Sequence, residues 1–166
     1  MRVTIAAVGK TRASPEQELF DLYLERTRGI ASKLGIFKLD VLVIDTSRAA
    51  SAEARMDEEA AKLASKSPAP AHRIVLDERG RAMTSEAFAR HLAKLRDSGT
   101  RDLVLFIGGP DGLAASLRDG AQERLALGPQ TWPHLLVRAM LAEQLYRACA
   151  ILAGHPYHRG SAGFPR

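Results

Sequence analysis

A glycine-rich turn after an apolar run is the first place where this sequence could bind a ligand. Residues 108–112 read Gly-Gly-Pro-Asp-Gly and follow Leu103–Ile107, which is typical of a buried strand. Ligands of open α/β sheets bind beyond the carboxyl ends of strands, where glycines let the backbone approach closely. Leu76-Asp77 ends another apolar run and has the same potential. A tight turn that needs positive φ explains the glycines equally well. The dinucleotide-binding and P-loop spacings are absent, which argues against nicotinamide cofactors and NTP hydrolysis.

Charged residues inside a long apolar segment are the second feature. Leu135–Ala153 is apolar on nearly every side, so we expect a helix that is buried on more than one face. One of the surfaces that bury it could belong to another subunit. At about 100° per residue, Arg138 lies nearly opposite the polar residues of this segment, Glu143, Gln144 and Arg147. A cation in such surroundings needs an anionic partner, either a ligand or an acid of the same or a neighbouring chain. Glu143 and Arg147 are spaced for an i,i+4 ion pair.

The third feature is the sequence His155-Pro156-Tyr157-His158-Arg159. From His134 onward the chain has four Arg, one Glu and three of its five His, so +3 of the net charge of +5 lies in the last 33 residues. Interleaved basic and aromatic side chains can contact phosphates and stack on bases. A solvated basic terminus is the alternative interpretation.

An alternation of strands and helices must position these residues. Hydrophobic patterns predict strands at Val3–Val8, Phe37–Ile44, Arg73–Asp77, Leu103–Ile107 and Arg124–Leu127. Capping signals and spacing predict helices from Ser14 to Gly29 or Gly35, over Ser51–Lys66, from Thr84 or Ser85 to Asp97, over Ala114–Asp119 and over Leu135–Ala153. A turn is expected at Arg79-Gly80-Arg81 and a linker at residues 67–71. The order predicts an α/β fold whose mainly parallel sheet has helices on both faces.

Composition narrows the classes further. A chain of 166 residues suits one domain, and its single cysteine excludes a disulfide framework or a cysteine zinc cluster. Cys149 is expected to be a core thiol, and His72 and His91 are expected to be surface residues without companions. No metal-ligand spacing stands out, so no metal is expected. Met1–Gly9 is too short for a signal peptide or membrane span, which favours a cytoplasmic protein. The net charge permits a polyanionic partner.

Four blocks, in order, carry a resemblance over essentially the whole chain. They follow a start at Ala6-Ala7-Val8-Gly9 and read IGGPDGL at 107–113, PHLLVR at 133–138, AEQLYRA at 142–148 and HPYHR at 155–159. The sequence resembles the RlmH family of SPOUT-class enzymes, which methylate N3 of pseudouridine 1915 in 23S ribosomal RNA.

The resemblance implies a single SPOUT methyltransferase domain over residues 1–166. Within it, a C-terminal trefoil knot would span approximately 73–159, and residues 160–166 would extend past the usual end of the family. It also implies a homodimer that acts on 23S rRNA within the ribosome and uses S-adenosyl-L-methionine. By the family pattern, the cofactor-binding residues are Leu76, Gly109, Gly128, Pro129, Gln130, Thr131, Trp132 and Pro133. The sequence departs from that pattern at Gly128-Pro129-Gln130 and at Trp132, where a smaller apolar residue or Phe is usual.

The resemblance also implies the catalytic residues, which are His134, Arg138, Tyr157, His158 and Arg159. The two arginines would hold phosphate or the developing anion, Tyr157 would stack or hydrogen-bond, and either His134 or His158 would accept the N3 proton. Two other functions stay open, a ribosome-associated RNA-binding module without catalysis and a SPOUT methyltransferase that acts on tRNA.

Overall fold

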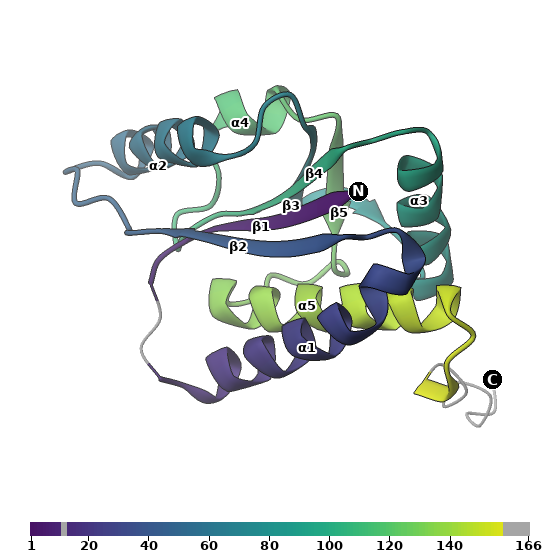
Figure 1. Cartoon of the computed structure of the whole chain (residues 1–166). Coiled ribbons are helices and arrows are strands. Elements are labelled where there is room, and N and C mark those ends of the chain that lie inside the picture. The colour runs from purple at the N-terminus through teal and green to yellow at the C-terminus, as the bar shows by residue number, and fades with distance from the viewer. Residues whose placement is uncertain (11–12, 158–166) are drawn as a thin grey trace.

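The protein is built around a sheet of five parallel strands (Figure 1). The structure, a computed structural model, describes residues 1–10 and 13–157. The strand order is β2-β1-β4-β3-β5, with β1 at Arg2–Val8, β2 at Lys38–Ile44, β3 at His72–Ala82, β4 at Asp102–Ile107 and β5 at Glu123–Ala126. The mainly parallel α/β fold expected from the sequence is confirmed.

Helices cover both faces of this sheet (Figure 1). Their bounds are α1 Pro15–Ala31, the 3₁₀ turn η1 Ser32–Leu34, α2 Ala52–Lys66, α3 Ser85–Asp97, α4 Ala115–Asp119 and α5 His134–Leu152. Helices α2 and α4 pack with side chains such as Phe106 on one face, and α1, α3 and α5 pack with side chains such as Leu105 on the other. Among the described residues, no helix is long and apolar enough to cross a membrane.

The predicted helix starts are confirmed by their caps. The side chains of Ser14, Ser51 and Thr84 each accept a hydrogen bond from a main-chain N–H three residues later, which satisfies donors that the helix itself leaves unpaired. Helix α1 continues past Gly29. The segment ends at Gly35, whose φ of +74° is a conformation that favours glycine.

Strand β3 differs from the prediction, because it continues beyond Asp77 and through the expected turn to Ala82. Leu125 of β5 lies opposite both Leu76 and Arg81, so residues 77–80 bulge out of the sheet. Gly80 makes this possible, since a Cβ there would lie 2.7 Å from the carbonyl carbon of Arg124. The bulge places polar side chains beyond the carboxyl end of the paired part of β3.

The strand order reverses direction in the middle of the sheet, between β1 and β4. Neighbouring strands β1 and β4 are followed in the chain by strands on opposite sides, β2 and β5. Such a point is where open α/β sheets leave room for a ligand, beyond the carboxyl ends of the strands. Gly9 follows β1 and Gly108 follows β4, so both glycines lie at this edge.

Candidate functional site

A cavity of about 390 Å³ opens at the carboxyl edge of β3 and β4. Three segments line it: residues 76–79, residues 107–113 and the connection from β5 to α5. It brings together six of the predicted cofactor-binding residues: Leu76, Gly109, Gly128, Gln130, Thr131 and Trp132. The other two, Pro129 and Pro133, do not line it, and Pro133 directly precedes α5.

The glycine turn owes its composition to two different constraints. A Cβ on Gly108 would lie 2.5 Å from the main chain of Gly112, and a Cβ on Gly109 would lie 3.0 Å from Val8 Cγ1. Gly112 has open space around it but a φ of +93°. Both interpretations of the sequence therefore apply: close approach at Gly108 and Gly109, and positive φ at Gly112.

Helix α2 supports this turn from behind, which the sequence did not reveal. Glu59 is 2 % exposed, and its Oε1 accepts a hydrogen bond from the N–H of Ser47 at 2.8 Å. Its Oε2 would lie 3.2 Å from a Cβ on Gly109, and within the described part of the chain this oxygen has no hydrogen-bond partner. Arg55 binds Asp111 through two hydrogen bonds of 2.7 and 3.0 Å, and hydrogen bonding to Arg55 lowers the pKa of the Asp111 carboxyl.

Two of the lining segments are joined directly. The hydroxyl of Thr131 donates to Oε2 of Glu78 at 2.6 Å, and Oδ1 of Asp77 accepts from the N–H of Arg79 at 2.8 Å. Glu78 and Arg79 were not among the predicted site residues. Their position directly after an apolar strand could have identified them as site residues, because residues that follow parallel strands lie together at the carboxyl edge of the sheet.

His134 and Arg138 converge at the start of α5. His134 lines the cavity, and a Cβ on Gly9 would lie 3.9 Å from His134 Nε2 and 3.6 Å from Arg138 Nη2. Burial, and then the charge of Arg138, lower the pKa of the His134 imidazole. The ring is therefore neutral over a wider pH range than an ordinary histidine and can accept a proton.

Arg138 has main-chain partners where an anion was expected. It is 3 % exposed, and its Nη2 donates to the carbonyls of Val8 and of Gly9, the latter at 2.7 Å. Over residues 1–10 and 13–157 it makes no ion pair, and its Nε has no hydrogen-bond partner. Burial lowers the pKa of its guanidinium. The expectation of an acidic partner within the chain is wrong for the described residues, because the ends of parallel strands present carbonyls there.

Tyr157 lies away from this pair, beside the C-terminal half of α5. Its hydroxyl donates to Oε1 of Glu143 at 3.1 Å and lies 3.3 Å from the hydroxyl of Tyr23. Its ring is 4.6 Å from that of Tyr146, and the Arg147 guanidinium lies 4.9 Å from it. Burial and then the bond with Tyr23 raise the pKa of Tyr157. His158 and Arg159, the other predicted catalytic residues of the tail, lie outside the described residues.

The remaining predictions near the site have mixed outcomes. The Glu143–Arg147 ion pair is confirmed at 2.6 Å. Cys149 is a core thiol, 1 % exposed, and burial raises its pKa to about 11. His72 and His91 were expected to lack companions, which is wrong, since both contact Glu123. The strand pairing that brings Glu123 to His72 spans 51 residues and has no local signal.

Comparisons with known proteins define the class. The family described as "Predicted SPOUT methyltransferase" matches residues 1–158. In fold, the chain is similar to a probable methylase family protein from Haemophilus influenzae Rd KW20, with a TM-score of 0.50 and 10 % identity over 99 % of this chain and 72 % of that one. The chain is therefore a member of the SPOUT methyltransferase class, and its sheet is all-parallel.

Individual relatives narrow the class to one family. The chain is 49 % identical to the ribosomal RNA large subunit methyltransferase H of Bradyrhizobium diazoefficiens, over 96 % of this chain and 99 % of that protein. It is 50 % identical to the protein of the same name from Rhizobium meliloti, with the same coverage. The chain therefore belongs to the RlmH family.

Proposed function

We propose that this protein transfers a methyl group from S-adenosylmethionine to N3 of pseudouridine 1915 in 23S ribosomal RNA, on assembled ribosomes in the cytoplasm. Family membership and the names of the relatives support a methyltransferase acting on large-subunit rRNA. The observation that carries the proposal is the cavity beyond β3 and β4, where His134, two close-packed glycines and the Thr131–Glu78 contact converge.

The cavity fits the cofactor in size and chemistry. Its volume of about 390 Å³ falls within the range of small-molecule sites. Gly108 and Gly109 form a cradle in which a Cβ would collide with the backbone or Val8. The rest of the lining combines apolar side chains such as Leu125 and Val137 with charged ones such as Glu78 and Arg118. The residues that would hold the cofactor are the six that line the cavity, Leu76, Gly109, Gly128, Gln130, Thr131 and Trp132. Pro129 and Pro133, the other two residues of the family pattern, would shape the connection between β5 and α5. When bound, S-adenosylmethionine supplies a methyl group on a sulfonium, which is a good leaving group.

The protein's own groups must then align the acceptor base and remove its N3 proton. His134 is the candidate proton acceptor beside the cavity. Burial and then the charge of Arg138 lower its pKa, which favours the neutral ring that can take a proton and also makes it a weaker base. The fixed positive charge of Arg138 stabilises the anion that develops on the base as the proton leaves. The two carbonyls that hold Arg138 keep this charge beside His134.

A second copy of the chain completes the site in this proposal. Tyr157 is bound at Glu143, nine residues and roughly 13 Å along α5 from His134. Tyr157 lines no part of the cofactor cavity of its own chain. We therefore assign Tyr157, together with His158 and Arg159, to the target base in the partner's site. The C-terminal trefoil knot over residues 73–159, within a single domain that ends in the extension 160–166, is part of the same proposal.

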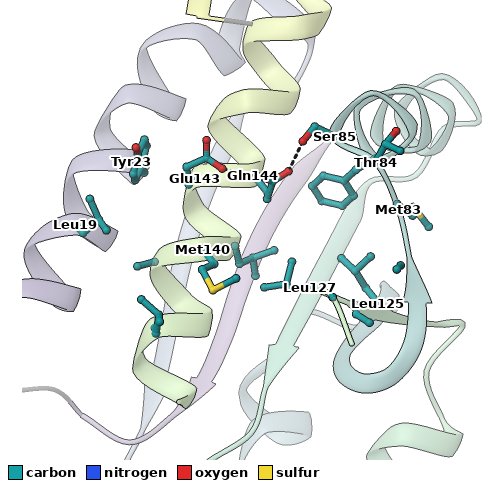
Figure 2. A pocket seen from close by; sticks show the side chains of 17 residues that line it. Leu19, Tyr23, Met83, Thr84, Ser85, Leu125, Leu127, Met140, Glu143 and Gln144 are labelled. Carbon is teal, nitrogen blue, oxygen red and sulfur yellow. Dashed lines mark hydrogen bonds between the residues drawn. The ribbon is translucent and has the colours of Figure 1, made fainter. Parts of the chain in front are cut away.

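The exposed side of α5 offers the surface for that partner. Figure 2 shows a second cavity, of about 560 Å³, with Met140 of α5 facing Leu125 and Leu127 and with Leu19 of α1 at its side. Leu19 is 40 % exposed. Apolar cavities with exposed leucines at their edge are typical of interfaces, and most oligomers are symmetric dimers. Sedimentation of the full chain measures this directly, and a monomer at micromolar concentration would contradict it.

The decisive experiment supplies labelled S-adenosylmethionine to ribosomes, separated subunits and tRNA that lack the modification. We expect label only in 23S rRNA of assembled ribosomes. Label in tRNA would show that the substrate is tRNA and not 23S rRNA. Ribosome binding without cofactor binding in calorimetry would indicate the non-catalytic RNA-binding module. Arg159→Ala should abolish transfer and retain cofactor binding, whereas unchanged transfer would refute the role of Arg159.

A further inference from the structure

Three metal-ligand side chains meet at the amino end of the sheet, opposite the cavity described above. His72 is the first residue of β3, Glu123 is the first residue of β5, and His91 lies on α3. His72 Nε2 lies 2.6 Å from Glu123 Oε1, and His91 Nε2 lies 2.9 Å from the same oxygen and 2.8 Å from Oε2. One donor atom from each residue lies within 4.8 Å of the other two.

The fold holds these three side chains on rigid elements. Glu123 is opposite Ile74 in the β3–β5 pairing, so it shares a face of the sheet with His72, two residues before Ile74. The neighbouring Gln122 fixes this pairing, because its N–H donates to the carbonyl of Arg73 and its side-chain oxygen accepts from the N–H of Arg73. A site built on strands and a helix is more accurately positioned than one on loops.

The donor set selects a class of ion. Two imidazole nitrogens and one carboxylate oxygen are ligands of zinc, at roughly 2.0–2.2 Å, whereas magnesium and calcium prefer oxygen alone. The side chains of His72, His91 and Glu123 are 22 %, 21 % and 26 % exposed. This partial exposure gives an ion a route of entry and leaves a fourth position open to water.

We propose that His72, His91 and Glu123 bind one divalent transition-metal ion of the zinc type. The ion joins β5, a strand of four residues, to both β3 and α3. Because β5 leads directly into residues 127–132 of the site cavity, the ion also steadies that connection. The inference stands on this geometry alone and is independent of the proposed methyl transfer.

The test titrates chelator-treated full-length protein with Co²⁺ and with Zn²⁺. We expect one ion per chain in calorimetry, a visible cobalt absorption band typical of low coordination number, and a higher melting temperature with Zn²⁺ but not with Mg²⁺. His91→Gln and Glu123→Gln should each weaken binding at least tenfold and remove the cobalt band. His155→Gln is the matched control, because it removes an exposed histidine outside the cluster and should leave binding unchanged.

Two results would overturn the proposal. The first is the absence of stoichiometric Co²⁺ and Zn²⁺ binding by the unsubstituted chain, which would leave the cluster as a carboxylate with two hydrogen-bonded histidines. The second is ion binding that survives His91→Gln but is lost in His155→Gln, which would place the ion at the C-terminal segment that contains His155. Circular dichroism of each variant ensures that the comparison is made between folded proteins.

Discussion

The two halves of helix α5 carry similar residue types and use them in opposite ways. In the N-terminal half, the partners of Arg138 among the described residues are the carbonyls of Val8 and Gly9, and burial favours the neutral form of His134 beside an open cavity. In the C-terminal half, Arg147, Glu143 and Tyr157 are one another's partners. Buried polar groups normally find partners, so groups left incompletely satisfied beside a cavity are the ones available to a ligand. Mutually satisfied groups instead fix the local conformation, which here holds Tyr157 in place for its proposed contact with the target base in the partner's site.

The largest expected difference between the halves comes from Arg138→Ala. It removes the charge beside His134 and leaves the carbonyls of Val8 and Gly9 buried without a donor. We expect methyl transfer to fall at least ~100-fold, as for loss of a positioned electrostatic group, and the free energy of unfolding to fall by about 1–3 kcal/mol. Labelled-methyl transfer to ribosomes and urea unfolding measure the two effects.

Arg147→Ala is the counterpart in the other half. Its ion pair with Glu143 is partly exposed, and such pairs contribute about 0–1 kcal/mol. Cofactor affinity should be unchanged in this variant. A loss of cofactor affinity in Arg147→Ala, or a loss of methyl transfer as large as that in Arg138→Ala, would abolish the distinction between the halves.

Gly108→Ala tests the cavity next to the N-terminal half. The new methyl group would meet the main chain of Gly112 at 2.5 Å, so the turn must open. Overpacking of this kind costs about 1–3 kcal/mol in the free energy of unfolding, and we expect the displaced turn to bind the cofactor more weakly in calorimetry. Gly29→Ala, in a helix and with nothing within 4 Å of its Cβ, is the matched control. A cofactor affinity in Gly108→Ala equal to that control would mean that the turn does not touch the cofactor.

Tyr157→Phe tests the C-terminal half of α5, where the polar side chains bind one another. It removes the hydroxyl bonds to Glu143 and Tyr23 and keeps the ring beside Tyr146. We expect a loss of about 1 kcal/mol in the free energy of unfolding and no change in cofactor affinity. A cofactor affinity lowered more than about threefold would show that this half communicates with the cavity.

The smallest effect is the pH dependence of His134. Because its pKa in the folded protein is below the ordinary 6.5, the unfolded chain binds more protons as the pH falls below 6.5. The free energy of unfolding should therefore decrease from pH 6.5 downward, and His134→Gln should flatten that decrease. Urea titrations between pH 5 and 8 compare the two proteins, whose other histidines are identical. Superimposable profiles would contradict the burial of His134.

Local chemistry explains why much of the fold was predictable. The caps at Ser14, Ser51 and Thr84 and the apolar run at Leu103–Ile107 are signals within a few residues, and each predicted the correct element. The Gly108–Gly112 turn likewise indicated the cavity. Because this turn directly follows a strand, it must lie at the carboxyl edge of the sheet, where the cavity opens.

Contacts between distant segments explain what was missed. Arg138 binds carbonyls 129 and 130 residues earlier, and no local pattern distinguishes such a partner from an acid. Glu59 reaches the glycine turn from a helix that is rich in alanine and charged residues, and the β3 bulge depends on the pairing of Leu125 with two residues. Each of these depends on register or packing between elements far apart in the chain.

The packing of α5 also limits how early the protein can fold during its synthesis. Strand β1 pairs with β2 and with β4. The face of the sheet that packs with α1 is also covered by α5, which ends at Leu152. During synthesis, the first strand, helix and second strand must wait with apolar side chains uncovered until nearly the last turn of α5 has emerged. Contacts so distant in sequence slow folding and prolong exposure to aggregation. We therefore expect the protein to complete folding only after α5 has emerged from the ribosome.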